Sequence, residues 1–308
     1  MKVIVTGGAG FIGSHLVDRL VRDGVAELVV IDNLHRGREE HIATHLANRS
    51  ARLVVGDIRD AELLAREFAG ADTVYHLAAQ SNVMGAVSDL RYSFESNVVG
   101  TVNVLEAARA CGVRRVVFSS SREVYGEVAE LPVAEDRPLN AKNAYGASKA
   151  AGELYCRVFA TTYGQEIAVL RLANVYGPRD SGRVIPLWLE AAAAGRDLTV
   201  YGGTQVIDFV WVDQVVEALV RAASVELDGL PINVGSGVGT PILELAERVI
   251  ALAGGRSRLD RQPARAVEVA QFCADVGRMR SRLGLEPPAD PLFALERLWE
   301  TYRQEVRA

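Results

Sequence analysis

The sequence predicts an α/β fold in which a doubly wound parallel sheet is followed by a smaller C-terminal α/β lobe. Short β-branched runs alternate with helical patterns through about the first 170 residues, which is typical of a parallel sheet built from βαβ units. The runs are continuously apolar, as expected for strands that helices cover on both faces. After Arg171, loops rich in glycine and proline separate the helical patterns, which indicates a change of architecture.

The predicted elements follow in chain order. Six strands are expected at Val3–Val5, Leu28–Ile31, Leu53–Val55, Thr73–His76, Val116–Ser119 and Ile167–Leu170. Helices are expected at Gly13–Asp23, Ala61–Phe68, about Tyr92 to Cys111 and Ala144–Tyr163, and later near Pro186–Ala194, Val212–Ser224, Pro241–Ala253 and Leu292–Glu305. We expect residues 1–172, with 206–235 returning, to form the sheet domain, and 173–205 with 236–308 to form the smaller lobe.

Composition excludes several classes of partner. The net charge of −5 argues against nucleic acid or an anionic membrane as a general partner. Three cysteines without metal-ligand spacing predict reduced thiols and no metal site. No apolar run approaches the ~20 residues that span a bilayer, and the first residues run straight into a strand without a cleavage-site pattern. We therefore expect a cytoplasmic protein.

The segment from Thr6 to Gly13 follows a predicted strand and opens a predicted helix. Gly7 permits a tight turn, Gly10 lets the backbone approach a pyrophosphate, and Gly13 lets helix and strand pack closely. An anion would then lie on free N–H groups at the helix N-terminus. This pattern predicts a dinucleotide site, for which a purely structural turn is the alternative interpretation.

An acidic residue stands at the end of each of the next two predicted strands after the glycine loop. Asp32 ends the second strand, where it is placed to accept a hydrogen bond from an adenosine-ribose hydroxyl and to repel a 2′-phosphate. NAD is therefore favoured over NADP, although Arg36 nearby leaves NADP open. Asp57 follows the third strand, where it could meet the adenine amino group. The first part of the chain is thus predicted to be an NAD-binding Rossmann domain.

A tyrosine and a lysine lie one helical turn apart later in the chain. Tyr145 and Lys149 share one face of a predicted helix. A free tyrosine has a pKa of about 10, and a lysine ammonium and a positively charged nicotinamide nearby would lower it. Ser119–Ser121 end a parallel strand, at the edge where such sheets bind ligands. A serine there can bind the hydroxyl being oxidised. This placement favours a catalytic role for Tyr145 and Lys149 over an incidental surface pair, and a functional role for the serines over a simple loop.

These segments together resemble the extended short-chain dehydrogenase/reductase family, in particular its nucleotide-sugar epimerase branch of UDP-glucose and UDP-glucuronate 4-epimerases. The resemblance covers nearly the whole chain. Its matching segments are Gly7-x2-Gly10-x2-Gly13, Asp32–Leu34, Gly56-Asp57, His76–Gln80, Asn97, Ser119–Ser121 with Val124–Gly126, Tyr145-x3-Lys149, Arg171–Pro178, Val184–Pro186 and Asp208–Val210.

The resemblance implies a UDP-sugar 4-epimerase that keeps NAD as a prosthetic group. Tyr145 would take the proton from the sugar 4-hydroxyl while a hydride passes from C4 to NAD. The 4-keto sugar would rotate, and the hydride would return to its other face. Ser121, with Ser120 beside it, would assist the proton transfer, and Lys149 would also hold the nicotinamide ribose.

The resemblance also assigns binding residues. It assigns the cofactor to Gly7, Gly10, Phe11, Ile12, Gly13, Asp32, Asn33, Asp57, Ile58, Leu77, Ala78, Ala79, Gln80, Asn97, Ser119, Tyr145 and Lys149. It assigns the substrate to Ser81, Ser121, Arg122, Tyr145, Asn174, Arg183, Val184, Tyr201 and Arg265. In this assignment Asn174 contacts the diphosphate, residues 198–201 lie against the nucleotide base, and Arg265 clamps phosphate by charge-assisted hydrogen bonds.

The sequence departs from the family pattern at two places. Arg122 stands where nucleotide-sugar dehydratases carry the Asp that protonates the leaving hydroxyl, which weighs against dehydration. Glu123 is retained, and a salt bridge to Arg122 is one interpretation of it. Ile207 stands where many relatives have an Arg, so one phosphate contact is absent or is supplied elsewhere, for example by Arg183.

Several alternatives stay open. A uronate carboxylate would need a cationic or hydroxyl seat, for which Ser81, Arg122, Arg179 and Arg183 are candidates, so the glucose and glucuronate series are not separated. A UDP-uronate decarboxylase, a dehydratase or reductase of the same fold, and a non-catalytic NAD-binding sensor are the rival functions. Because the helices 92–111 and 144–163 carry apolar residues on more than one face, we also expect a homodimer that pairs them.

Overall fold

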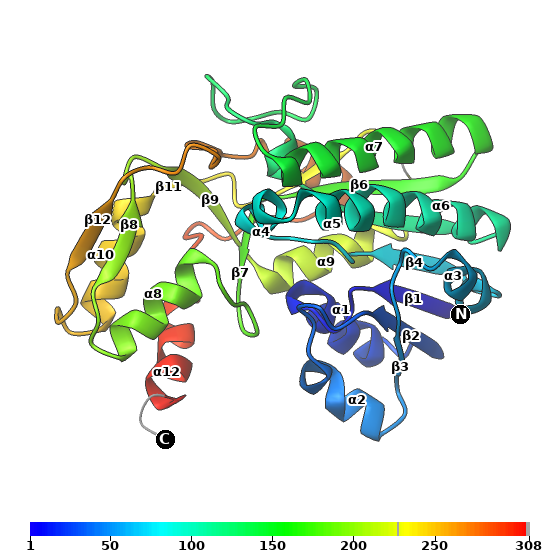
Figure 1. The fold of residues 1–308 in the computed structure, drawn as a ribbon, viewed down its shortest axis with the longest axis horizontal. Helices are drawn as coiled ribbons and strands as arrows, with labels where there is room; N and C mark the ends of the chain where they lie inside the picture. The colour runs from blue at the N-terminus through cyan, green and yellow to red at the C-terminus, as the bar shows by residue number, and fades with distance from the viewer. Residues whose placement is uncertain (227, 306–308) are drawn as a thin grey trace.

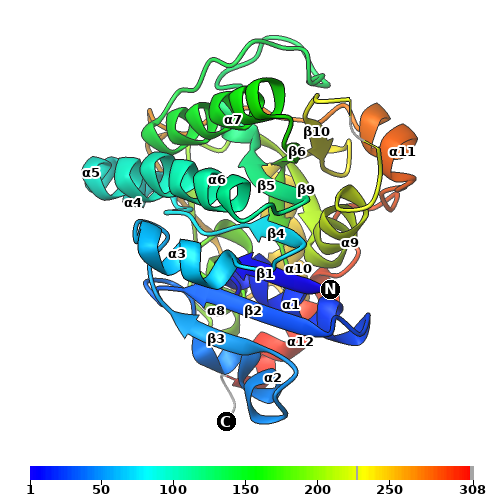
Figure 2. The same ribbon diagram turned by 90° about the vertical axis from the view of Figure 1, so that its right-hand side faces the viewer.

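The main sheet of the protein has seven parallel strands. The structure, a computed structural model, describes residues 1–226 and 228–305. The strands are β1 (Lys2–Thr6), β2 (Glu27–Asp32), β3 (Arg52–Val55), β4 (Thr73–His76), β5 (Arg115–Ser121), β6 (Glu166–Leu172) and β10 (Ile232–Val234). They lie in the order β3-β2-β1-β4-β5-β6-β10, all parallel (Figure 2). The predicted fold class is confirmed, and the reversal of strand order between β1 and β4 creates the crevice in which such sheets bind ligands.

Helices cover both faces of this sheet (Figures 1 and 2). Helices α1 (Phe11–Arg22) and α9 (Val212–Ala222) pack on one face, and α3 (Ala61–Phe68), α6 (Gly100–Ala110) and α7 (Ala144–Tyr163) pack on the other. The alternation of side chains along a strand divides the core accordingly. In β1, Val3 and Val5 belong to the core beside α1 and α9, whereas Ile4 belongs to the core beside α3, α6 and α7.

The helix predicted from Tyr92 to Cys111 is interrupted in the structure. It begins as α5 (Leu90–Phe94), after the short helix α4 (Val83–Ser88), and reaches α6 through a π-helical turn at Glu95–Val99. Asn97 lies in this turn, and its side chain makes the tertiary hydrogen bonds described below. A π-turn inserts one residue into a helix and is frequent at functional sites, and the apolar periodicity of the sequence does not reveal it.

Helix α2 (Ala43–Ala47) lies beside β3, and most of the elements after β6 form a smaller lobe beside the carboxyl edge of the sheet (Figure 1). Strands β7 (Asn174–Tyr176) and β9 (Val206–Trp211) pair in parallel, and β11 (Gly239–Pro241) pairs antiparallel with β9. Strands β8 (Leu198–Tyr201) and β12 (Leu259–Gln262) form a separate pair. The helices of this part are α8 (Val184–Ala193), α10 (Ile242–Leu252) and α12 (Leu295–Glu305).

Two elements late in the chain lie beside the main sheet. Strand β10 pairs with β6 at the sheet edge, and α11 (Gly277–Leu283) packs against β10 and α9. Among residues 1–226 and 228–305, no helix is both long enough and apolar enough to cross a membrane. In the same described residues no three His, Cys, Asp or Glu side chains converge as metal ligands.

Candidate active site

A cleft of about 780 Å³ opens between the carboxyl edge of the main sheet and the smaller lobe. Its walls come from the glycine loop, the ends of β2 to β5, the start of α7 and the segments around β7, α8 and β8. All the residues predicted for catalysis, cofactor and substrate line this cleft, with the exception of Gln80 and Asn97. The tertiary structure therefore brings together motifs that are spread over 259 positions, from Gly7 to Arg265.

The glycine loop is a close backbone cradle. Gly7 has a φ of +74°, and a Cβ there would lie 2.6 Å from the Ala78 backbone nitrogen. A Cβ on Gly13 would lie 2.1 Å from the Gly7 carbonyl oxygen, so only glycine allows α1 to start this close to β1. Gly10 is the N-cap of α1, and no side chain caps this helix end. The first amides of the helix can then bind a pyrophosphate, so the cradle fits the diphosphate of a dinucleotide.

The two acidic residues after β2 and β3 have different environments. Asp32 accepts hydrogen bonds from the backbone N–H groups of Ala9 (3.0 Å) and Leu34 (2.9 Å), and burial raises the pKa of its carboxyl group. Asp57 is bound by the side chains of Asn33 (2.9 Å) and Arg59 (2.9 and 3.0 Å). Burial raises the pKa of Asp57, but these hydrogen bonds lower it further, to about 2. Both carboxylates line the cleft, but Asp57 already has strong partners.

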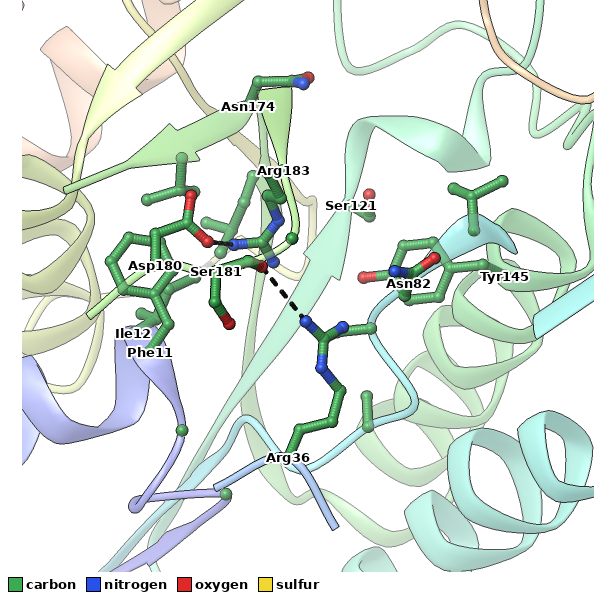
Figure 3. A pocket seen from close by; sticks show the side chains of 18 of the residues that line it. Phe11, Ile12, Arg36, Asn82, Ser121, Tyr145, Asn174, Asp180, Ser181 and Arg183 are labelled. Carbon is green, nitrogen blue, oxygen red and sulfur yellow. Dashed lines mark hydrogen bonds and ion pairs between the residues drawn. The ribbon is translucent and has the colours of Figure 1, made fainter. Parts of the chain in front are cut away.

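Tyr145 and Lys149 extend from the first turns of α7 toward the end of β5. Tyr145 and Ser121 both line the cleft (Figure 3), and although Ser121 lowers the pKa of Tyr145, burial raises it to about 12. Lys149 donates a hydrogen bond to the Ser119 carbonyl oxygen at 2.7 Å, and burial lowers the pKa of its ammonium to about 8. Among the charges that lower the Tyr145 pKa, the largest contribution comes from Arg183. In the protein alone, burial therefore raises the Tyr145 pKa by more than the neighbouring positive charges lower it.

The consecutive serines at the end of β5 face in opposite directions, as alternate residues of a strand do. The Ser121 oxygen lies on the cleft side, where it also accepts a hydrogen bond from the Glu123 backbone N–H at 3.2 Å. The Ser120 hydroxyl donates to Glu153 at 2.5 Å, and Glu153 forms a buried ion pair with Arg171 at 2.7 Å. Of the two serines predicted for catalysis, only Ser121 has its hydroxyl at Tyr145, and Ser120 is bound into the core.

Arg122 and Glu123 form a salt bridge at the same end of the cleft. Arg122 Nη2 lies 2.9 Å from Glu123 Oε1, which confirms the salt-bridge interpretation. The second Glu123 oxygen accepts a hydrogen bond from the Asn143 amide at 2.7 Å. The Arg122 guanidinium also lies 5.7 Å from the centre of the Phe272 ring. Both charges act on the Tyr145 hydroxyl, Glu123 raising its pKa and Arg122 lowering it, so the pair lies close to the Tyr145 phenol.

Two arginines approach the glycine loop from opposite walls (Figure 3). Arg183 pairs with Asp180 at 2.7 Å, and its guanidinium lies 5.5 Å from the centre of the Phe11 ring. Arg36 crosses from the loop after β2 and donates a hydrogen bond to the Ser181 carbonyl oxygen at 3.4 Å. Positive charge therefore gathers near the cradle.

The remaining predicted substrate residues also line the cleft, and two of them, Tyr201 and Arg265, lie together. Arg265 lies 3.6 Å from the centre of the Tyr201 ring and pairs with Glu268 at 3.1 Å. Asn174 begins β7 and lines the cleft, as do Val184 and Ser81. This part of the cleft is suited to a flat aromatic base beside a phosphate, because aromatic and guanidinium groups are placed together.

The sequence interpretation missed Asn82, Asn143 and Asp180. Asn82 lies beside Tyr145 (Figure 3) and caps α4 by accepting a hydrogen bond from the Gly85 N–H at 3.0 Å. Asn143 caps α7 in the same way through the Gly146 N–H at 2.9 Å. An asparagine directly before a helical pattern is an N-cap signal, so both could have been found. Nothing local in the sequence marks Asp180 as buried.

Comparisons with known proteins agree with this site. The sequence model of the NAD dependent epimerase/dehydratase family matches residues 3–235. A UDP-glucose 4-epimerase of Mycolicibacterium smegmatis is 38% identical over an alignment of 313 residues that covers 99% of each chain. The crystal structure of a UDP-glucose 4-epimerase from Thermotoga maritima with UDP-glucose has 33% identity and a TM-score of 0.94, covering 99% of this chain and 100% of that one.

A second branch of chemistry is represented among the solved structures. A dTDP-glucose 4,6-dehydratase from Streptomyces venezuelae, crystallised with NAD, has 34% identity and a TM-score of 0.92, covering 99% of this chain and 97% of that one. The likeness thus extends over the whole chain in both sequence and structure. The chain belongs to the NAD-dependent epimerase/dehydratase family.

Proposed function

We propose that this protein is an NAD-dependent UDP-sugar 4-epimerase that acts through a transient 4-keto sugar. The observation that carries the proposal is that Tyr145 and Ser121 line the same cleft as the glycine cradle, close enough for Ser121 to lower the pKa of Tyr145. Lys149 lies one helical turn further along α7, and the second lobe supplies arginines on the opposite wall. This arrangement places a proton acceptor, a cofactor site and an anion site around one cavity.

The residues present fit the cofactor. Gly7, Gly10 and Gly13 would hold the pyrophosphate, since a side chain at Gly7 or Gly13 would collide with backbone. Asp32 would accept a hydrogen bond from the adenosine ribose, and its negative charge favours NAD over NADP. When bound, NAD takes up a hydride from C4 of the sugar and gives it back.

The protein's own residues would handle the proton. The Tyr145 phenol would accept the proton of the 4-hydroxyl, and Ser121 would orient that hydroxyl through its hydrogen bond. Because burial holds the pKa of Tyr145 at about 12 in the protein alone, added positive charge is needed to make the phenolate accessible at neutral pH. Lys149, fixed by the Ser119 carbonyl oxygen, keeps an ammonium close to this region. Tyr145 would return the proton when the hydride returns.

The second lobe would bind the nucleotide. We propose that residues 1–172 with 206–235 form the NAD-binding domain, and that 173–205 with 236–308 form the nucleotide-sugar lobe, although β9 pairs with β7 of the lobe and α11 packs against β10 and α9 of the sheet domain. Asn174 and Arg183 would contact the diphosphate, and Tyr201 with Arg265 would lie against the base and its phosphate. Arg183, close to the glycine loop, would supply the phosphate contact that Ile207 does not make.

A direct product assay tests the proposal. The purified protein is incubated separately with UDP-glucose, UDP-N-acetylglucosamine and UDP-glucuronate, without added cofactor, and the products are identified by NMR. We expect a 4-epimer to form from at least one of them, with no net change in NADH absorbance. Release of carbon dioxide would instead indicate a decarboxylase, and a 4-keto-6-deoxy sugar a dehydratase. No turnover of any of the three would support a non-catalytic NAD-binding protein.

We also propose a homodimer that acts in the cytoplasm. Apolar side chains that helices usually bury are exposed along α5, the π-helical turn and α7. They are Leu90, Phe94, Val99, Leu154, Tyr155 and Val158. A second copy placed on this face would bury them in a four-helix bundle made from residues 92–111 and 144–163 of each chain. The free thiols of Cys111, Cys156 and Cys273 suit a reducing compartment, which subcellular fractionation would test.

A further inference from the structure

We propose that residues 178–183 form a strap that closes the cofactor site and keeps NAD on the protein, and that Asp18 and Arg36 hold this strap closed. The inference goes beyond the proposed reaction, because it concerns retention of the cofactor and not the sugar that is turned over. It assigns a role to Asp18, a residue of α1 that lies outside the lining of the cleft.

The start of the strap is anchored on α1, the helix that begins at the glycine cradle. His15 Nε2 donates a hydrogen bond to the Pro178 carbonyl oxygen at 2.9 Å. Arg179 Nη1 lies 2.8 Å from one oxygen of Asp18, and His45 Nε2 of α2 lies 2.7 Å from the other. Because His15 and Asp18 are three residues apart, they share one face of the helix. The strap is therefore tied to α1 at two neighbouring points.

The strap then reaches the N-terminus of α1 and the loop after β2 (Figure 3). Phe11 is the first residue of α1, and the Arg183 guanidinium lies 5.5 Å from the centre of its ring. Arg36 donates to the Ser181 carbonyl oxygen at 3.4 Å. These contacts join the helix end that would bind the diphosphate to the loop after Asp32, which would bind the adenosine ribose. The strap and Arg36 thus connect the two parts of the cofactor site.

Three charged side chains meet where the strap contacts the loop after β2. The Asp180 side chain is 2% exposed, and one of its oxygens lies 2.7 Å from Arg183. Among the described residues, its other oxygen has no hydrogen-bond partner. Burial and the positive charge of Arg183 lower the pKa of Arg36, whereas the charge of Asp180 raises it. A diphosphate bound at the cradle would attract both guanidinium groups, so bound cofactor favours the closed strap.

The backbone of the strap depends on its anchors. Arg179 has a φ of +65°, a conformation that residues other than glycine rarely adopt, and Gly182 has a φ of +72°. The ion pair with Asp18 helps to hold Arg179 in this conformation. Loss of that ion pair would release the strap at its start, and loss of Arg36 would release it at its middle. Either change should therefore open the same element.

Exchange of bound cofactor measures the closure without any sugar. The purified protein, saturated with NAD, is mixed with an excess of radiolabelled NAD, and incorporation of label is followed on gel-filtered samples. We expect Asp18→Asn and Arg36→Gln each to exchange NAD at least tenfold faster than the wild type. Asp23→Asn removes an ion pair with Arg19 at the end of the same helix, away from the strap, and should stay within twofold. Unchanged rates in both strap variants would overturn the inference.

A double variant separates one strap from two independent contacts. Asp18→Asn combined with Arg36→Gln should exchange NAD at most twice as fast as the faster single variant, since a strap that is already open gains nothing from a second release. Multiplication of the two single effects would mean separate contacts and would contradict the strap. Acceleration by Arg36→Gln alone would make Arg36 an ordinary cofactor ligand and would also overturn the inference.

Hydrogen–deuterium exchange of backbone amides reports the opening directly. With NAD present, we expect peptides that contain residues 178–183 to exchange faster in Asp18→Asn than in the wild type, and peptides of β4 and β5 to stay unchanged. Unaltered exchange in the strap peptides would contradict the proposal. If Asp18→Asn does not fold, Arg179→Gln breaks the same ion pair from the strap side and decides. Because no sugar takes part in these measurements, a lack of epimerisation would refute the proposed function and leave the strap intact.

Discussion

The side-chain amide of Asn97 binds both backbone polar groups of Gln80. Its oxygen accepts from the Gln80 N–H at 2.7 Å, and its nitrogen donates to the Gln80 carbonyl oxygen at 3.1 Å and to the Ser148 hydroxyl at 2.9 Å. Neither residue lines the cleft. Asn97 therefore ties the loop after β4, which carries the predicted cofactor-binding positions 77–79, to the π-helical turn and to α7.

Replacing Asn97 should destabilise the protein and disturb the cofactor loop. Asn97→Ala removes three buried hydrogen bonds and leaves the Gln80 amide unsatisfied, so we expect a loss of about 3 kcal/mol in the free energy of unfolding. Urea denaturation measures this. Asn103→Ala, on the same helical segment, loses two bonds of 3.2 and 3.1 Å at a partly exposed site, and its cost should be less than half. Equal costs would contradict a special role for Asn97.

Tyr145 should be needed for turnover and not for folding. Because we propose the phenol as the proton acceptor, Tyr145→Phe should lower kcat by roughly 10²–10⁴-fold with an unchanged circular dichroism spectrum. Tyr155→Phe makes the same change on the same helix, where the ring is 42% exposed, and should keep kcat within twofold. A Tyr145→Phe enzyme with full activity would refute the mechanism.

The two serines at the end of β5 should have separable effects. Ser121→Ala removes the hydroxyl at Tyr145, so we expect kcat to fall at least tenfold with little change in stability. Ser120→Ala removes a hydrogen bond to the buried Glu153 carboxylate, so we expect a stability loss of about 2 kcal/mol and a smaller fall in kcat. Steady-state kinetics and urea titration on both variants would show this crossover, and the reverse pattern would place Ser120 at the reacting group.

The pKa of Lys149 predicts how the stability of the NAD-free protein changes with pH. Burial lowers that pKa from 10.5 to about 8. Between these values the unfolded chain keeps a proton that the folded protein has lost, so unfolding takes up a proton and the stability rises with pH. Other buried groups act oppositely at high pH: burial raises the pKa of Cys273 to about 11 and that of Tyr145 to about 12.

A comparison with Lys149→Met isolates the lysine contribution. The unfolding free energy of the wild type minus that of the variant should increase by about 2 kcal/mol from pH 8 to pH 9.5, since one pKa unit corresponds to about 1.4 kcal/mol. Urea titrations at several pH values in this window measure the difference. Parallel curves for the two proteins would show that the folded Lys149 ammonium has an ordinary pKa.

The exposed apolar face of α7 should control the oligomeric state. Leu154 and Val158 are 56% and 47% exposed and lie one turn apart. Two glutamates there, Leu154→Glu with Val158→Glu, would place charges in the proposed helix bundle, so sedimentation should change from a dimer to a monomer. Leu230→Glu, on a residue 57% exposed outside these helices, should remain dimeric. A wild-type protein that sediments as a monomer at micromolar concentration would contradict the homodimer.

The elements that the sequence predicted well are those whose signals are local. The six predicted strands of the main sheet all exist, because strands covered on both faces must be apolar throughout. The short strands of the second lobe were not predicted, since runs such as Asn174–Tyr176 and Gly239–Pro241 have only three residues and carry little periodicity. The π-helical turn was also missed, because one extra residue hardly alters an apolar pattern that still reads as a helix.

What the sequence determined by itself was the set of short-range motifs: the glycine loop, the acid after β2, and the tyrosine and lysine one turn apart. Each depends on geometry within a few residues, and backbone sterics and helical spacing dictate that geometry. The tertiary structure alone decided that Ser121 and not Ser120 faces Tyr145, that Asp57 is held by Arg59, and that Glu123 cancels the charge of Arg122. Burial and charge depend on groups brought from distant parts of the chain, such as Arg183, whose positive charge lowers the pKa of Tyr145, so the electrostatics of the site exists only in the folded protein.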